Sequence, residues 1–464
     1  MGLVKIIYSS QFDEFFKERK SGAVKGSEET DVLVKEIIEA VRTEGDAAVR
    51  RYSERYEKSV PGNFEVPPGA AEDAWKKMID SEPLLASSFS LAYDNIRHFA
   101  ELQKEQLKDF EAEITPGIYA GQLVIPVEKA AIYVPGGRFP LISSALMGLV
   151  PAAAAGVGEK LLVSPPGPDG LPDWRILAAA HLAGADRIFA LGGAQAIAAL
   201  ALGTETIPRV DLIAGPGNKY VAEAKRLLFG EVGIDFIAGP TDVLVVSDSW
   251  RGVHTPSLQG GVVDFSEADG NMEGMEKAAE IIAADMLAQA EHDPDASARA
   301  LLPDMEMAEL IEKALEKRLA ALPTRAIAQA SLERGGLLIV YKTKEEAIII
   351  ANKISPEHLE LHVSSPREWI PGLRNFGSLF IGPLSAEVLG DYSAGINHTL
   401  PTSSSARFTG GLSVRNFLKT VTTLRCESSQ NYIQALNAAQ AIARAEGLAG
   451  HAESAALRTL PRIY

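Results

Sequence analysis

From about residue 120 the chain alternates short apolar runs with alanine-rich segments, and this alternation limits its fold more than any other feature. Each apolar run has the length of one strand and is bounded by turn-forming residues, whereas the segments between the runs are long enough for helices. Strands that alternate with helices predict a parallel, doubly wound α/β sheet. The runs lie at 130–134, 160–164, 187–191, 210–214, 242–246, 336–340 and 378–381.

Most of these predicted strands end in a glycine-rich turn, the place where doubly wound sheets bind ligands. Gly192-Gly193 and Gly215-Pro216-Gly217-Asn218 each precede a helical segment, so their backbone N–H groups could bind an anion. An ordinary tight turn is the alternative in both places. No GxGxxG motif follows a predicted strand, so these turns indicate an α/β enzyme without identifying its ligand.

The segments around the predicted strands suggest how the chain is divided. Residues 10–115 have the spacing of helices, and the alanine-rich tail at 433–458 predicts one helix or a pair. Residues 249–272 are polar, rich in glycine and aperiodic, and we expect a long surface loop there. We therefore expect two Rossmann-like domains between a helical N-terminal region and a helical C-terminal tail. The expected limits are 1–117 for the N-terminal region, 118–247 and 248–383 for the two α/β domains, and 384–464 for a substrate loop and the tail.

Charge and composition exclude several classes of protein. The 464 residues carry a formal net charge of −16, which repels phosphate backbones, so nucleic acid is a poor partner; solubility alone also explains the charge. The only cysteine, Cys426, permits neither an internal disulfide nor a multi-cysteine zinc site. The apolar stretch 141–157 is short and interrupted by proline and glycine, and no signal sequence is present. We therefore expect a cytoplasmic protein with no membrane partner.

Two of the polar clusters that contain histidine lie beside predicted helices. Gln289 and His292 are three residues apart at the end of a predicted helix and share one face, where an amide oxygen and an imidazole could bind a divalent metal. Exposed polar side chains without a role are the alternative. Glu357 and His358 follow Ser355-Pro356, which predicts a helix start with Ser355 as N-cap. The pair could act as general acid and base, or Glu357 could only stabilise the helix end, and local sequence does not decide between these roles.

Two further clusters lie toward the C-terminus. Residues 390–402 form a glycine-containing polar loop, in which Asp391 could bind a metal and His398 a substrate; a solvated loop is the alternative. Glu446 and His451 flank a glycine-containing break in the helical tail, and taken alone this break is structural.

Taken together and in this order, these motifs resemble the histidinol dehydrogenase family over about residues 30 to 458. The strongest agreement lies in the following stretches: residues 133–137, GGAQAIAALALGTETIP from Gly192, GPGNKYVAEAKR from Gly215, GIDFIAGPTDVLV from Gly233, QAEHDP from Gln289, PEHLEL from Pro356, GDYSAGINHTLPT from Gly390 and EGLAGH from Glu446.

The resemblance implies a zinc-dependent homodimer that oxidises L-histidinol to L-histidine with two NAD, through an enzyme-held aldehyde. His358 would act as the base in both oxidations, and Glu357 would activate the water that attacks the aldehyde. The resemblance assigns the other positions as follows: zinc ligands at Gln289, His292, Asp391 and His451; substrate contacts at Thr241, Gln289, His292, His358, Asp391, His398, Glu446 and His451; and NAD contacts at Tyr133, Gln195 and Asn218. The C-terminal tail would cross to the partner subunit, so Glu446 and His451 would complete the partner's site.

Two departures from the family pattern concern the substrate. Residues 249–272 look longer than the usual link to the QAEHDP helix, and Thr241 replaces the serine that is frequent in the family. Oxidation of another small hydroxylated substrate, such as a sulfonated propanediol, is therefore the alternative activity. A non-catalytic paralogue is a third reading, which the intact Glu357-His358 pair and the four metal-ligand positions argue against.

Overall fold

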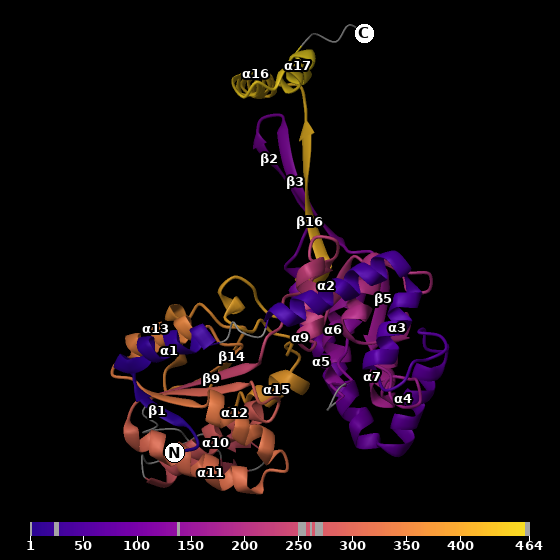
Figure 1. The fold of residues 1–464 in the computed structure, drawn as a ribbon. Helices are drawn as coiled ribbons and strands as arrows, with labels where there is room; N and C mark the ends of the chain where they lie inside the picture. The colour runs from indigo at the N-terminus through magenta and orange to yellow at the C-terminus, as the bar shows by residue number, and fades with distance from the viewer. Residues whose placement is uncertain are drawn as a thin grey trace.

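Two parallel sheets form the centres of two α/β lobes, and a long arm of strands and helices extends away from both (Figure 1). The structure is a computed structural model that describes residues 2–22, 27–136, 140–248, 257–259, 262–264 and 272–459. The predicted α/β class, with doubly wound parallel sheets, is confirmed. The limits expected at residues 117, 247 and 383 stay a prediction.

The first lobe is built on a five-stranded parallel sheet with the order β6-β5-β4-β7-β8. The first of these strands in sequence, β4, lies at the centre, and the chain winds outward from it in both directions. The strands predicted at 130, 160, 187 and 210 correspond to the first four in the following set: β4 (Lys129–Tyr133), β5 (Glu159–Ser164), β6 (Arg187–Ala190), β7 (Leu212–Ala214) and β8 (Gly233–Ile234).

Helices cover both faces of this sheet because successive strand residues point to opposite sides. Ala130 and Ile132 of β4 pack with α4 to α7, whereas Ala131 and Tyr133 pack with α2, α3, α8 and α9. All four side chains are buried. The helices are α2 (Ser27–Glu44), α3 (Asp46–Tyr56), α4 (Ala70–Ser81), α5 (Pro83–Glu105), α6 (Ser143–Ala155), α7 (Trp174–Leu182), α8 (Gly193–Leu202) and α9 (Lys219–Leu228).

The second lobe repeats this winding around β9, with the sheet order β1-β13-β12-β9-β14-β15. Its outer strand β1 comes from the N-terminus of the chain and pairs in parallel with β13. The strands are β1 (Lys5–Tyr8), β9 (Asp242–Ser247), β12 (Ser297–Leu302), β13 (Leu337–Val340), β14 (His358–His362) and β15 (Ser378–Ile381). Helices α10 (Met272–Ala290), α11 (Met305–Ala321) and α12 (Arg325–Gly335) pack on one face, and α1 (Phe12–Gly22) and α13 (Lys344–Ile354) lie on the other.

The prediction that Ser355-Pro356 begins a helix is wrong. Ser355 instead ends α13, with φ 54° in the left-handed region, and His358 begins strand β14. Proline is common directly after a helix end because it cannot continue the helix, and this reading of the same two residues is the correct one. Glu357 therefore lies at the amino end of a buried strand.

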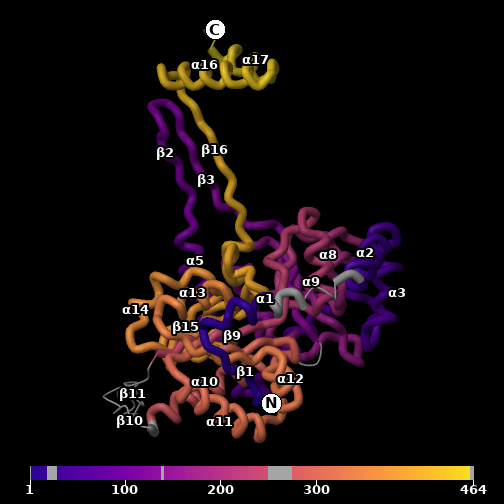
Figure 2. The backbone as a smooth tube through the Cα atoms, turned by 60° about the vertical axis from the view of Figure 1, so that its left-hand side comes forward, coloured from indigo at the N-terminus to yellow at the C-terminus, as the bar shows by residue number. Residues whose placement is uncertain are grey.

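The arm consists of the antiparallel strands β16-β3-β2 and a helix pair at its tip (Figure 2). Its strands are β2 (Phe110–Thr115), β3 (Ile118–Pro126) and β16 (Leu418–Cys426). The predicted helical tail is confirmed as the pair α16 (Gln430–Ala445) and α17 (Ala449–Leu457). Several large apolar side chains of the arm are exposed, and Leu424 is 73% exposed.

The predicted loop at 249–272 lies mostly outside the described residues. Within it, β10 (Ser257–Gln259) pairs antiparallel with β11 (Val262–Asp264). The helices in the described part of the chain lack the length and apolar character that a membrane span requires.

A buried ion pair fixes the glycine-rich turn that follows β7. Lys225 of α9 pairs with Asp235, and their side chains are 2% and 0% exposed. Lys225 Nζ also donates to the Gly215 carbonyl at 3.1 Å, and the Gly215 N–H donates to Asp235 at 2.8 Å. The pair therefore holds the turn that carries Asn218.

We expect Lys225→Met to lower the free energy of unfolding by about 3–5 kcal/mol, because the substitution leaves the Asp235 carboxylate buried without its partner. Urea unfolding measures this change. Lys76→Met, which removes an exposed ion pair with Glu72, is the control and should leave the unfolding curve in place. Equal effects of the two substitutions would contradict the prediction.

Candidate active site

The candidate site lies at the amino-terminal edge of the second sheet. Thr241 directly precedes β9, and Asp242 is its first residue. Glu357 and His358 lie in the same way at the start of the adjacent β14. Helix α10 runs back along the sheet and ends beside these residues with Gln289. The side chains that the sequence places far apart thus meet where two parallel strands begin.

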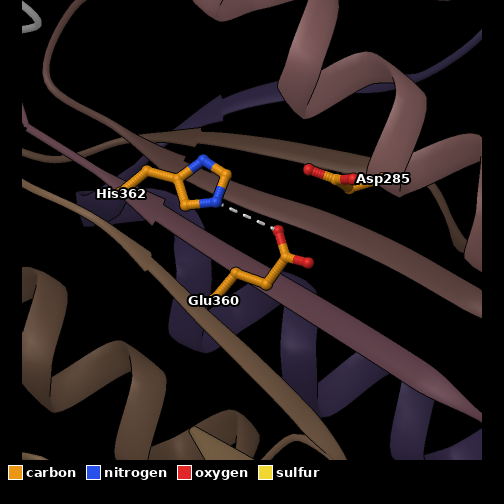
Figure 3. A group of neighbouring side chains, drawn as sticks. All are labelled: Asp285, Glu360 and His362. Atoms are coloured by element: carbon orange, nitrogen blue, oxygen red, sulfur yellow. Dashed lines mark ion pairs between the residues drawn. The ribbon is translucent and has the colours of Figure 1, made fainter. Parts of the chain in front are cut away.

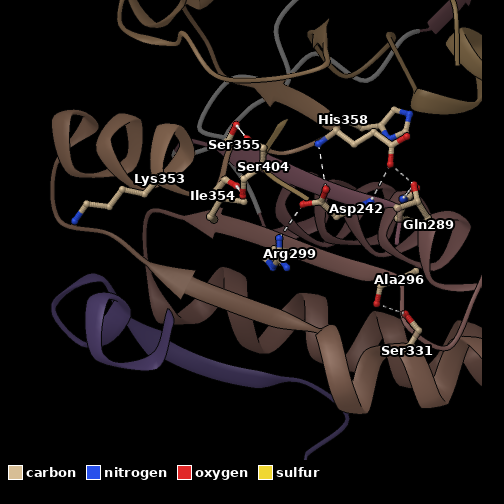
Figure 4. Close-up of polar contacts among 12 residues, drawn as sticks. Asp242, Gln289, Ala296, Arg299, Ser331, Lys353, Ile354, Ser355, His358 and Ser404 are labelled. Carbon is tan, nitrogen blue, oxygen red and sulfur yellow. Dashed lines mark hydrogen bonds and ion pairs between the residues drawn. The ribbon is translucent and has the colours of Figure 1, made fainter. Parts of the chain in front are cut away.

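Glu357 is fixed by contacts to both its side chain and its backbone, and its partner Asp242 is itself paired with Arg299 (Figure 4). Its Oε2 accepts from the Thr241 hydroxyl at 2.5 Å and from the Asp242 N–H at 3.2 Å. Its own N–H donates to Asp242 Oδ1 at 3.1 Å, and Arg299 donates to Asp242 Oδ2 at 2.8 Å. Burial raises the pKa of the Glu357 carboxyl to about 7, a suitable value for a group that exchanges protons near neutral pH.

His358 is 3% exposed and is surrounded by carboxylates. Its Nδ1 lies 3.5 Å from Glu387 Oε1 and 3.9 Å from Glu357 Oε2, and its Nε2 lies 3.7 Å from Asp391 Oδ1. Burial alone lowers the pKa of His358, but Glu387, Glu357 and Asp391 outweigh burial and hold it well above its usual value. Neither ring nitrogen makes a hydrogen bond to the described residues, so both remain available to a ligand.

The Gln289 amide joins Thr241 to Glu387. In the orientation that satisfies its neighbours, its oxygen accepts from the Asp242 N–H at 3.0 Å and contacts the Thr241 hydroxyl, whose single proton Gln289 and Glu357 share, and its NH2 group donates to Glu387 Oε1 at 2.5 Å. Gln289 is fully buried, and Glu387 is 3% exposed. Burial raises the pKa of the Glu387 carboxyl to about 8.

Glu387 and Asp391 come from α15 (Glu387–Tyr392), a short helix that follows β15. They line a cavity of about 450 Å³ together with His292 and with residues 140–143 of the first lobe. The cavity therefore lies between the two lobes. His398 is partly buried nearby: its Nδ1 lies 2.9 Å from the Asp391 carbonyl and its Nε2 lies 3.1 Å from the Ser144 hydroxyl.

Glu446 and His451 lie elsewhere in the chain. Both are exposed: Glu446 lies at the junction of α16 and α17, and His451 lies within α17. Figures 1 and 2 place these helices at the tip of the arm, away from the second lobe. The chain by itself thus brings together Gln289, His292, Asp391, His398, Glu357 and His358, but not Glu446 and His451.

The residues present fit a divalent cation. Glu387, Asp391 and His358 offer ligand atoms within 4.8 Å of one another. Glu387 Oε2 is buried and makes no hydrogen bond to the described residues. Several buried carboxylates around one imidazole repel each other, and a cation relieves this repulsion. Nitrogen and oxygen donors of this kind suit Zn²⁺.

A second polar group extends beneath this site in the interior of the lobe (Figure 3). Asp285, Glu360 and His362 come from α10 and β14, and His362 Nε2 lies 3.3 Å from Glu360 Oε2. Glu360 Oε1 accepts from the Glu387 N–H at 3.1 Å, so it anchors the first residue of α15. The strand period of two turns His358, Glu360 and His362 to one face.

The three positions assigned to NAD share one cleft in the first lobe. Tyr133 ends β4, Gln195 lies in the first turn of α8, and Asn218 caps α9. All three line a cavity of about 360 Å³ at the carboxyl ends of the strands, where such sheets bind dinucleotides. Tyr56 and Tyr220 contribute aromatic walls.

Sequence reasoning missed several residues of these sites. Asp242 and Glu387 lie in or beside the sequence motifs listed above. A single carboxylate in a strand or a short helix has no local sequence pattern that would mark it as a site residue. Glu57 of the cofactor cleft comes from the end of α3, where nothing in the sequence marks it. Periodicity on β14 could have drawn attention to Glu360 and His362, had the strand been predicted.

A dinucleotide cleft in one lobe, together with a buried acid/base pair and metal-ligand groups in the other, defines a dinucleotide-dependent α/β oxidoreductase. The sequence profile described as histidinol dehydrogenase matches residues 20–254 and 273–459. The chain belongs to the histidinol dehydrogenase family, whose members act on CH–OH groups with NAD and Zn²⁺.

Individual relatives agree over nearly the full length. The histidinol dehydrogenase of Thermus thermophilus is 43% identical over 426 residues, covering 92% of this chain and 94% of the relative. That of Methylococcus capsulatus is 40% identical over 460 residues, covering 98% of each. The crystal structure of histidinol dehydrogenase from Elizabethkingia anophelis matches with a TM-score of 0.85 at 30% identity, covering 99% of this chain and 98% of that one. The profile leaves residues 255–272 unmatched, within the segment that looked longer than usual.

Proposed function

We propose that this enzyme oxidises L-histidinol to L-histidine through histidinal, the last steps of histidine biosynthesis. The observation that carries the proposal is the burial of Glu357 and His358 together, beside metal-ligand groups, in a chain of this family. The relatives above are all named histidinol dehydrogenase, which favours histidinol over a sulfonated propanediol.

His358 and Glu357 divide the proton transfers in this proposal. His358 takes the proton of the substrate alcohol, and its environment of carboxylates stabilises the imidazolium that results. When bound, NAD would supply the hydride acceptor for each of the two oxidations. Glu357, with a pKa near 7, takes a proton from the water that attacks the aldehyde, while Thr241 and Asp242 keep its carboxyl in place.

Gln289, His292 and Asp391 are the proposed zinc ligands within one chain, and His451 of the partner subunit is the proposed fourth. Zn²⁺ held by these residues would supply a Lewis acid for the basic nitrogens of the substrate. His398 and Glu446 are the proposed substrate contacts beside it. Tyr133, Gln195 and Asn218 are proposed to contact NAD in the first lobe.

The position of the arm supports a homodimer in which Glu446 and His451 act in the partner's site. Both side chains are exposed at the tip of an arm that leads away from their own catalytic pair. Strands and helices of this arm also expose apolar side chains, which a second copy would cover.

The proposed reaction predicts a fixed stoichiometry. Each L-histidinol consumed should yield two NADH and one L-histidine, because two hydrides leave the same carbon. Absorbance of NADH and chromatography of the product measure the two quantities. If a sulfonated propanediol gives NADH and histidinol does not, the proposed substrate is wrong.

Glu357→Gln should slow the oxidation of the aldehyde much more than the oxidation of the alcohol. The amide keeps the hydrogen-bonding shape of the side chain but cannot take a proton from water. General-base catalysis of this kind contributes roughly 10²–10⁴-fold. Rates measured separately with histidinol and with histidinal test the assignment, and an equal loss in both steps would refute it.

His451→Ala should lower both the zinc content and the activity. A mixture of this variant with Glu357→Gln, which is slow in aldehyde oxidation, should regain formation of L-histidine on forming heterodimers, because one of the two mixed sites then has Glu357 and His451 intact. Metal analysis and activity after mixing are the measurements. Glu453→Ala, which changes an exposed side chain of the same helix, is the control. Heterodimers without restored activity would show that His451 does not act across the dimer.

A further inference from the structure

The segment that follows α15 is hydrogen-bonded to helices of the first lobe. Asn95 of α5 donates to the Ser393 carbonyl at 2.7 Å, and Asn397 donates to the Met147 carbonyl of α6 at 2.7 Å. Between these contacts, Gly395 has φ 99°, and a Cβ atom there would lie 2.6 Å from the Asn95 carbonyl oxygen. A side chain at this position would therefore be strained as well as crowded. The segment is thus held closely against α5 and α6.

His398, at the end of this segment, is contacted by both lobes. Its Nδ1 lies 2.9 Å from the carbonyl oxygen of Asp391, which can only accept, so Nδ1 carries a proton. Its Nε2 lies 3.1 Å from Oγ of Ser144, the second residue of α6, whose side chain is 2% exposed. Burial lowers the pKa of His398, and in the neutral ring Nε2 accepts from the Ser144 hydroxyl. The two contacts together fix one tautomer and one orientation of the ring.

Ser144 stands beside the cavity between the lobes. The residue before it, Ser143, lines this cavity of about 450 Å³ together with Asp391. A side chain that contacts a substrate is most effective when its own orientation is locked by a supporting hydrogen bond. For His398, which is proposed to contact the substrate, one such bond comes from the backbone of its own lobe and the other from the side chain of Ser144 in the first lobe.

We propose that Ser144 is a positioning residue of the substrate site, through which the first lobe holds the His398 ring in place. Contact between His398 and the substrate then requires the two lobes to be docked together, because Ser144 and Asp391 hold the ring from opposite lobes. The proposal rests on the proposed function and on the substrate contact assigned to His398 there.

A double-mutant cycle tests whether Ser144 acts through His398. Ser144→Ala removes the donor to Nε2 and should raise KM for L-histidinol roughly tenfold, with a smaller change in kcat. KM for NAD and the zinc content should stay at their wild-type values. His398→Asn keeps an N–H group that can donate to the Asp391 carbonyl but has no ring nitrogen to accept from Ser144. In that background Ser144→Ala should change KM by less than about twofold.

The control is Ser90→Ala, which removes a serine hydroxyl that donates to a backbone carbonyl within α5 of the same lobe. It should leave KM for L-histidinol unchanged. A purely structural role of Ser144 would lower the thermal stability and would change KM by the same factor with and without His398. Such equal factors, or an unchanged KM in Ser144→Ala alone, would overturn the proposal.

A measurement on the wild type keeps the proposal testable if Ser144→Ala does not fold. In protein with ¹⁵N-labelled histidine, the imidazole shifts should place the proton of His398 on Nδ1, and His398→Asn identifies the signal. A proton on Nε2 would mean that Ser144 does not donate to the ring and would overturn the proposal. If the wild type oxidises another small alcohol instead of histidinol, the same cycle with that alcohol tests Ser144, and only the proposed function is refuted. Independent effects of the two substitutions in an enzyme that oxidises histidinol refute only the role of Ser144.

Discussion

The lobe that carries the candidate site depends on one reciprocal contact between two parallel strands. Asp242 accepts from the Glu357 backbone, and Glu357 accepts from the Asp242 backbone, where β9 and β14 begin side by side. More than a hundred residues separate the two in sequence. The same contact thus ties the register of the two strands to the position of the Glu357 carboxyl.

Apart from the additional strand β1 in the second lobe, the two lobes have the same strand order, but they use opposite edges of their sheets. In the first lobe the cleft lies at the carboxyl ends of the strands, as expected for a doubly wound sheet. In the second lobe the proposed catalytic residues stand at the amino ends of β9 and β14, and α10 and α15 supply the remaining side chains of the candidate site. A search restricted to carboxyl ends would have overlooked this site.

Sequence patterns predicted most of the first lobe because its strands are continuous apolar runs that end in glycine. They predicted less of the second lobe. β14 reads His-Leu-Glu-Leu-His, so it is not a continuous apolar run. Polar and apolar residues alternate along it, but its polar residues all face a buried site rather than solvent, so it also differs from a surface strand. β12 reads Ser-Ala-Arg-Ala-Leu-Leu, whose alanines suit a helix equally well, and only its place between β13 and β9 makes it a strand.

The candidate site shows the same division between local and tertiary information. The motifs around Gln289, Glu357 and Asp391 were found in the sequence, but their meeting around His358 depends on three elements distant in the chain. Glu387 illustrates what a motif cannot supply: it contacts His358 and Gln289 only because Glu360, two residues along the strand from His358, holds the start of α15.

The buried charges explain why such an arrangement needs a ligand to be complete. Glu357, Glu387 and Asp391 are gathered around one imidazole. Their burial is energetically costly, and it raises the pKa values of both glutamates. A purely structural core would replace such groups by apolar ones, which are more stable in the interior. Their retention at a cavity between the lobes is understandable if a cation and a substrate with basic nitrogens bind there. The negative charge that is costly to bury is then what gives the site affinity for both.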